Sequence, residues 1–117
     1  MIRRIESGAR MSQAVVAQGF VFLAGQVAAD TSRDVEGQTA QILAEIDRLL
    51  GLAGSSKQHI VSANVYLADI GDFAAMNRAW DRWVAADAKP ARATIEAALA
   101  APEYRVEIQV VAVAAGG

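Results

Sequence analysis

The sequence predicts a single α+β domain in which two amphipathic helices cover one face of a β-sheet. The first observation is length, because 117 residues is the usual size of one domain and allows one hydrophobic core. The second is periodicity, because two segments carry apolar residues at helical spacing while others read as strands. The third is order: strand, strand, strand, helix, strand, helix, strand, strand, with no internal repeat.

Three strands are predicted at the start of the chain. Residues 2–6 alternate weakly between apolar and polar side chains and predict a short strand. Residues 12–17 and 20–24 flank a Gln-Gly dipeptide, which predicts a hairpin with a tight turn. The mostly polar or small residues 28–33 predict a loop. At the other end of the chain, Gly116-Gly117 predicts a loose tail.

The first helix is predicted to follow Asp34. Aspartate is a suitable N-cap, because its carboxylate can accept a hydrogen bond from a backbone N–H of the first turn. The residues that recur at helical spacing and form one apolar stripe are Ile42, Ile46, Leu49, Leu50 and Ala53. Gly54 is expected to end the helix in a C-cap role.

The second half of the chain predicts three strands and one helix. The strands cover residues 60–68, 91–98 and 105–113, each with period-two alternation. Asp72 is expected to cap the helix, and Pro90 ends the following connection because proline disfavours helix in the residue before it. The apolar stripe of this helix comprises Phe73, Met76, Trp80, Trp83 and Val84.

Two helices can cover only one face of the predicted sheet. We expect them to cover the face that carries Val61, Val65, Ile95 and Ile108. The opposite face is then expected to carry Asn64, Tyr66, Arg92, Thr94, Glu96 and Glu107, with Phe20 and Phe22 from the hairpin. That face is too polar for a core and too apolar for a surface, so packing against another subunit would resolve the conflict.

Composition argues against several classes of function. The net charge is −2 and no Lys/Arg run is present, whereas nucleic-acid binding needs a basic patch. The absence of cysteine excludes disulfides, thiol nucleophiles and thiolate metal sites. The start of the chain lacks the apolar region of a signal peptide, and no segment approaches the roughly 18 apolar residues of a membrane helix. We therefore expect a soluble, cytoplasmic protein without metal or cofactor.

Arg92 and Glu107 are the two residues whose chemistry stands out. The planar fork of an arginine matches a carboxylate, and a nearby glutamate could hold a water molecule and move protons. By strand alternation, both are expected on the side of the sheet opposite the helices. The alternative interpretation is a structural ion pair across the strand ladder.

Other candidate residues have simpler explanations. His59 is the only histidine, and a metal site normally needs several ligands, so we expect a loop residue. Trp80 and Trp83 could stack on a ligand, but their helical spacing is more typical of core residues. Asn77, at the edge of the same stripe, is expected to bond to nearby backbone.

Six segments, in order and with matching spacing, resemble the RidA/YjgF family. They are residues 12–16, 22–26, 53–56, 69–77, 90–97 and 106–108. The Trp80-x-x-Trp83 pattern looks most like the YoaB-type branch. The resemblance implies one chorismate-mutase-like α+β domain over residues 1–117, with a mixed β-sheet and two helices on one face. It also implies a homotrimer with three clefts between subunits.

The resemblance further implies an activity. RidA-like proteins hydrolyse reactive enamine and imine intermediates, of the 2-aminoacrylate and 2-iminobutanoate type, to 2-keto acids and ammonia. Arg92 matches the family's substrate-carboxylate arginine, and Glu107 matches the acidic residue that positions or activates water. Gly25 matches a glycine whose backbone lines the cleft, and Asn77 matches a frequent asparagine near it. The implied ligand is a small carboxylate or imino acid.

Three positions depart from the family pattern. Met11 stands where active members carry tyrosine, Ala24 where serine precedes the Gly-Gln pair, and Thr94 where a cysteine often follows the arginine. Two polar contacts to the ligand are therefore missing, while the carboxylate clamp is retained.

Three functions remain open on the sequence. They are an imine deaminase, a non-catalytic small-acid-binding or regulatory trimer, and an endoribonuclease or translation inhibitor. The sequence pI of about 5.3, the lack of a basic patch and the lack of a plausible catalytic histidine argue against the third.

Overall fold

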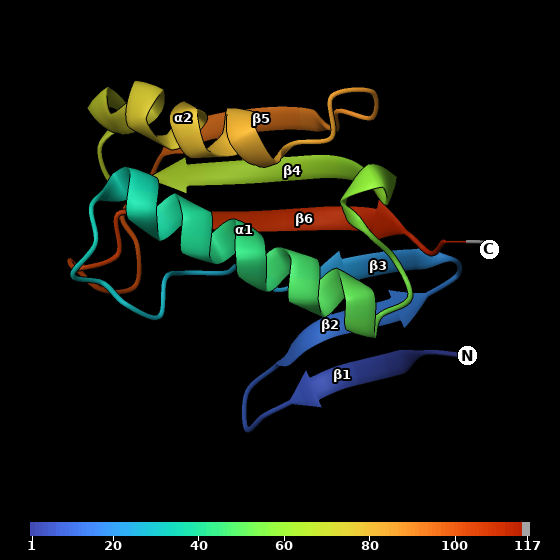
Figure 1. The fold of residues 1–117 in the computed structure, drawn as a ribbon. Coiled ribbons are helices and arrows are strands. Elements are labelled where there is room, and N and C mark those ends of the chain that lie inside the picture. The colour runs from blue at the N-terminus through green and yellow to red at the C-terminus, as the bar shows by residue number, and fades with distance from the viewer. Residues whose placement is uncertain (116–117) are drawn as a thin grey trace.

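The computed structural model describes residues 1–115 as one six-stranded sheet with two helices on the same face (Figure 1). The strands are β1 (Arg3–Ser7), β2 (Ser12–Ala17), β3 (Phe20–Leu23), β4 (Ile60–Leu67), β5 (Ala91–Glu96) and β6 (Val106–Val113). They lie in the order β1-β2-β3-β6-β4-β5, and β4–β5 is the one parallel pair in the described sheet. The mixed sheet and the predicted order of elements are confirmed. The tail predicted at Gly116-Gly117 lies outside the described residues.

The hairpin between β2 and β3 has the predicted two-residue turn. Gln18 and Gly19 have φ angles of 54° and 79°, and Ala17 pairs with Phe20. Two successive positive φ angles define a type I′ turn, whose twist matches that of the flanking strands. The turn therefore fixes the register that puts Val21 and Leu23 on the buried side.

Helix α1 (Val35–Leu52) is capped at both ends as the sequence predicts. The Asp34 carboxylate accepts a 2.8 Å hydrogen bond from the backbone N–H of Gly37. At the other end Gly54 has a φ of +78°, and the Ser55 N–H donates to the Leu50 carbonyl at 2.8 Å. This Schellman arrangement satisfies carbonyls that the last turn leaves without a partner. All five residues of the predicted apolar stripe are buried.

Helix α2 (Phe73–Trp83) begins where expected, but Asp72 does not cap it. The helix continues from a short 3₁₀ turn, η2 (Ile70–Asp72), which Asp69 caps through the Gly71 N–H at 2.8 Å. The backbone at Asp72 is near-helical, with φ −86° and ψ 9°, whereas an N-cap side chain folds back from extended backbone. The Asp72 carboxylate accepts instead from Arg105 Nη2 at 2.7 Å. A second 3₁₀ turn, η1 (Lys57–His59), precedes β4.

The hydrophobic core lies between the two helices and one face of the sheet (Figure 1). Val65 and Ile108 are fully buried there, as predicted. Val61, however, is 45% exposed, so its predicted inward position is wrong. A register shift in the β4–β6 pair between Ile60 and Ser62 is the cause, because a bulge reverses the alternation on one side of it. Ile60 occupies the buried position instead.

Strand β5 presents to the helices the side opposite to the one expected. Its parallel register with β4 places Arg92 beside Ala63, which is buried under the helices. Thr94 and Glu96 follow on the same side by alternation, while Ile95 is 51% exposed on the far side. The prediction that Arg92, Thr94 and Glu96 lie opposite the helices is therefore wrong. Alternation separates a strand into two sets of side chains, but it does not say which set faces the core.

The open face of the sheet carries both polar and apolar side chains, as predicted. Phe20 and Phe22 are each 42% exposed, with ring centroids 6.2 Å apart. Tyr66 and Glu107 are paired between β4 and β6 on this face, because the residues that flank them in their strands are buried on the other. Among the described residues, no helix is long and apolar enough to cross a membrane.

Candidate functional site

Arg92 is held against helix α2 by four side chains, which together form the arginine site. Its Nη1 donates to Asn77 Oδ1 at 2.8 Å and lies 3.8 Å from Met76 Sδ. The guanidinium carbon lies 5.0 Å from the centroid of Trp80 and 5.8 Å from that of Phe73. The guanidinium therefore packs against two aromatic rings and is not paired with an acidic side chain among the described residues.

The charge of Arg92 is only partly compensated. Among residues 1–115, no carboxylate lies within ion-pair distance of it. Partial burial lowers the pKa of Arg92, and the field of Asp81 acts in the opposite direction. An arginine stays protonated at any physiological pH, so this site presents a partly desolvated cation.

Glu107 lies on the other face of the sheet, in a hollow of about 360 Å³ that we call the glutamate hollow. Its lining comes from β4, β6 and the loops after β3 and β5, and comprises Gly25, Tyr66, Ala97, Ala98, Leu99, Glu107 and Gln109. The wall therefore mixes small apolar residues with one carboxylate, one phenol and one amide.

Gly25 leaves the space that the Glu107 carboxylate occupies. A Cβ on Gly25 would lie 3.0 Å from Glu107 Cδ and would clash with Oε2. Gly25 is held there because the next residue, Gln26, forms an isolated bridge with Ile108 of β6. The two backbone hydrogen bonds of this bridge measure 2.9 and 3.1 Å. The structure thus brings two of the predicted site residues, Gly25 and Glu107, side by side.

Gln26 is a residue that sequence reasoning missed. Its side chain is 7% exposed, and its Nε2 donates to Gln13 Oε1 at 2.9 Å and to the Ala24 carbonyl at 3.0 Å. A buried amide in this position fixes the loop that carries Ala24 and Gly25. The available signal was a lone polar residue three positions after the end of an apolar strand.

The structure does not bring Arg92 and Glu107 together within one chain. Arg92 faces α2, whereas Glu107 lies on the open face. The structural ion pair that the sequence left open is also absent from the described residues. One chain therefore presents two separate chemical groups, an arginine site and a glutamate hollow.

The other predicted site residues, Met11 excepted, divide between these two places. Asn77 bonds to Arg92 rather than to nearby backbone. Thr94 lies on the Arg92 side, and its hydroxyl is buried without a hydrogen-bond partner in the described part of the chain. Ala24 adjoins the glutamate hollow through Gly25, and Met11 is 57% exposed just before β2.

His59 and Trp80 have the structural positions that the sequence predicts, but Trp80 also contacts Arg92. His59 bonds to Ser56 through Nδ1 at 2.8 Å, at the start of β4. Trp80 is a core residue, 6% exposed, but it also supports Arg92. Residues 1–115 contain no cluster of three or more histidine or acidic side chains that could hold a metal ion.

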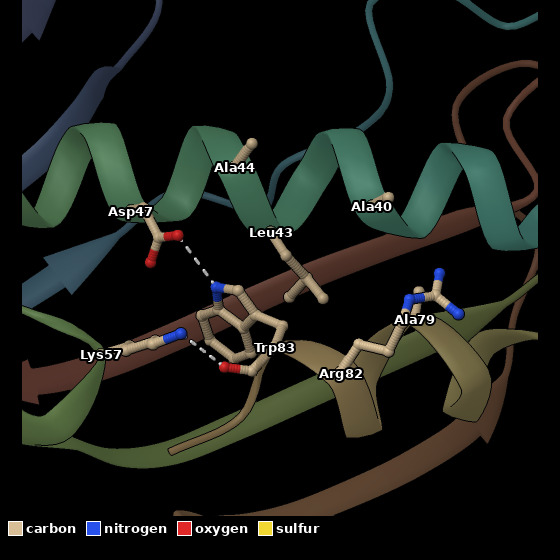
Figure 2. A pocket seen from close by; sticks show the side chains of 8 residues that line it. All are labelled: Ala40, Leu43, Ala44, Asp47, Lys57, Ala79, Arg82 and Trp83. Atoms are coloured by element: carbon tan, nitrogen blue, oxygen red, sulfur yellow. Dashed lines mark hydrogen bonds between the residues drawn. The ribbon is translucent and has the colours of Figure 1, made fainter.

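A separate groove of about 270 Å³ lies between the two helices (Figure 2). Trp83 Nε1 donates to Asp47 Oδ2 at 3.0 Å, and Lys57 Nζ donates to the Trp83 carbonyl at 2.7 Å. Arg82, at its other end, binds Glu36 at 2.8 Å. The polar groups drawn around this groove already bind one another or a neighbouring side chain, so helix packing accounts for it.

The fold defines a single-domain α+β protein of the chorismate-mutase-like type. The sequence model of the endoribonuclease L-PSP family matches residues 1–114. A RutC family protein of Haemophilus ducreyi is 46% identical over 112 residues, which are 96% of each chain. The RutC family protein YoaB of Escherichia coli is 45% identical over 111 residues, 95% of this chain and 96% of that one.

A solved structure of a similar protein has the same fold as this chain. The crystal structure of a YjgF family protein from Neisseria meningitidis has a TM-score of 0.97 and 48% identity to this chain. The match covers 100% of this chain and 98% of the Neisseria chain. The protein therefore belongs to the RidA/YjgF family.

Proposed function

We propose that the protein hydrolyses enamine and imine intermediates, of the 2-aminoacrylate and 2-iminobutanoate type, to 2-keto acids and ammonia. The observation that carries this proposal is Arg92, a partly buried guanidinium without an acidic partner among the described residues. Every substrate of this type bears a carboxylate, which an arginine fork binds with defined geometry.

Glu107 is the proposed general base. In the overall reaction, water adds to the carbon of the C=N bond, and the C–N bond then breaks to release ammonia. Glu107 would accept a proton from water as the C–O bond forms and pass it to nitrogen, which gives a carbinolamine. It would then move the hydroxyl proton of the carbinolamine to nitrogen, so that ammonia leaves as the C=O bond forms. Gly25 supports this role because it leaves the Glu107 carboxylate room beside the hollow. A fixed carboxylate on the substrate would supply most of the orientation.

We propose that Arg92 and Glu107 meet across the interfaces of a homotrimer, one from each of two neighbouring subunits. Their positions on opposite faces of a chain support this arrangement, because two such groups can reach one ligand only from two copies. The exposed Phe20 and Phe22 on the open face supply apolar area for such an interface. The ligand would then lie in a cleft between subunits.

A non-catalytic small-acid-binding trimer is the second candidate. Met11 and Ala24 favour it, because they stand where the family resemblance implies hydroxyl groups. A protein with the arginine clamp but without those hydroxyls could bind a 2-keto acid without hydrolysing its imine.

A coupled assay separates the two candidates. A PLP-dependent threonine or serine dehydratase would generate the imine, and keto-acid release would be followed with the parent protein, Arg92→Ala and Glu107→Gln. We expect the parent to accelerate release and both variants to lose most of that effect. A folded parent that binds 2-oxobutanoate but gives no acceleration would favour the binding function.

Mixed oligomers test the proposed interface. Arg92→Ala and Glu107→Ala chains, refolded together in equal amounts, should recover roughly one quarter of the parental sites, because each intact site then needs one unaltered residue from each of two copies. The variants refolded separately are the control. No recovery in the mixture would place both residues in the same chain's site.

A further inference from the structure

We propose that Asn77 and Trp80 are positioning residues that hold the Arg92 guanidinium in one orientation. In this orientation the edge formed by Nε and Nη2 is the one that binds the ligand carboxylate. This inference rests on the function proposed above. It assigns a direction of approach to the ligand, and with it a chemical restriction on what the site accepts.

Nη1 of Arg92 faces acceptors on helix α2. A guanidinium carries two hydrogens on each Nη and one on Nε. Asn77 Oδ1 accepts from Nη1 at 2.8 Å, and Met76 Sδ lies 3.8 Å from the same nitrogen as a weak acceptor. Both acceptors belong to α2, so this helix occupies the Nη1 end of the group.

The edge left to a ligand follows from that occupation. A carboxylate can bind a guanidinium end-on, through both Nη atoms, or side-on, through Nε and Nη2. The end-on mode would compete with Asn77 for Nη1. The side-on mode uses two nitrogens that have no hydrogen-bond partner among residues 1–115.

The aromatic rings restrain the guanidinium. Trp80 is 6% exposed and belongs to the core, so its ring is fixed, and it lies 5.0 Å from the guanidinium carbon. Phe73 lies 5.8 Å away and is 43% exposed. A cation over a ring face is attracted to it, so Trp80 limits the movement of Arg92 while Asn77 limits its rotation.

This arrangement predicts which ligands fit. A side-on fork binds two oxygens of the ligand in the plane of the guanidinium, and a carboxylate offers two such oxygens. In a 2-imino or 2-oxo acid, conjugation favours a C=N or C=O bond near the plane of the carboxylate. Fixing the edge of Arg92 therefore fixes the direction in which the reacting carbon faces the water. The expected substrate class is planar 2-imino carboxylates.

Kinetics of α2 variants give the first test. Asn77→Ala should lower kcat about tenfold or more with a smaller rise in KM, because the charge of Arg92 remains but its orientation is lost. Trp80→Phe should retain most of the activity, and Trp80→Leu should lose it. Arg78→Ala is the matched control on the same helix, since Arg78 binds Glu36 instead, and it should leave kcat and KM unchanged. Far-UV circular dichroism would verify folding, and Asn77→Ala carries the test if Trp80→Leu fails to fold.

A spectroscopic readout reports the edge itself. In the side-on mode, addition of 2-oxobutanoate should shift the ¹⁵N–¹H signal of Arg92 Nε, and butanone, which lacks the carboxylate, should leave that signal unchanged. Binding without a shift at Nε would overturn the inference. So would an Asn77→Ala variant whose kcat and KM match the parent while Arg92→Ala is inactive, an outcome that leaves the proposed function standing. If Arg92→Ala itself kept full activity, the proposed function would fail as well.

Discussion

At the residue scale, the lack of a side chain at Gly25 leaves room for the Glu107 carboxyl group. The φ of Gly25 lies outside the left-handed region, so alanine suits the backbone, and the three atoms nearest to an added Cβ all belong to the Glu107 side chain. We expect Gly25→Ala to displace Glu107, to lower activity and to destabilise the fold by about 1–2 kcal/mol through overpacking. Urea unfolding measures the stability.

The double variant Gly25→Ala/Glu107→Ala is the control for this prediction. Removing the carboxylate should remove the clash, so the two substitutions should not be additive and stability should recover. A Gly25→Ala variant as stable as the parent would contradict the role given to this glycine.

Thr94 carries a buried hydroxyl without a partner among the described residues. Thr94→Val should leave the free energy of unfolding unchanged or raise it by roughly 1 kcal/mol, because valine has the same shape and no polar group to desolvate. Thr39→Val is the matched control, since the Thr39 hydroxyl donates to the Val35 carbonyl at 2.7 Å, and its loss should destabilise. A drop in stability for Thr94→Val would mean that the hydroxyl finds a partner in the assembled protein.

At the scale of elements, sequence patterns predicted what was strongly periodic or chemically capped. Helix α1 followed from its stripe and from Asp34, and the hairpin followed from the Gln-Gly turn. The bulge beside Ile60 could not be predicted from the sequence, because a shift in strand register requires no particular residue type. The elements were therefore predictable one by one, and their local irregularities were not.

The candidate site was predictable in its residues and not in its geometry. Arg92, Asn77, Gly25 and Glu107 all lie in one of the two places described, but Arg92 was expected on the wrong face. At the edge strand β5 the apolar Ile95 suggested the buried side, yet α2 covers the side of Arg92 with aromatic rings. Such a cation-on-ring contact depends on tertiary packing, which alternation alone does not encode.

Glu36 ties the two helices together and should respond to pH. A hydrogen bond from Arg78, and a second one from Arg82 with a smaller effect, hold the pKa of Glu36 below its ordinary value of 4.5. A carboxylate with a lowered folded-state pKa stabilises the fold fully above its unfolded-state pKa, and the stabilisation is lost as the pH falls through the lowered value. We expect the unfolding midpoint of Glu36→Gln to fall less than that of the parent between about pH 7 and pH 3.

The comparison for Glu36 is Glu103→Gln. Glu103 is exposed and makes no ion pair in the described part of the chain, so this variant should follow the parental pH profile. Parallel profiles for all three proteins would show that the Glu36 cluster contributes nothing measurable, as happens with many surface ion pairs.

At the scale of the whole molecule, the open face of the sheet governs association in our proposal. Phe22→Asp places a charge in the middle of the apolar part of that face and should convert a trimer to monomers in sedimentation-velocity experiments. Leu52→Asp, at a residue that is 48% exposed at the end of α1, should leave the mass unchanged. A Phe22→Asp protein of parental mass would locate the interface elsewhere.

The separation of Arg92 from Glu107 would make activity in a cell depend on how many chains are assembled. If each reaction needs one group from each of two chains, dilution removes active sites and not only molecules. Output per chain would then fall once abundance drops below the dissociation constant of the assembly, by mass action. Synthesis and degradation of the chain would therefore change total capacity more steeply than in proportion to its amount.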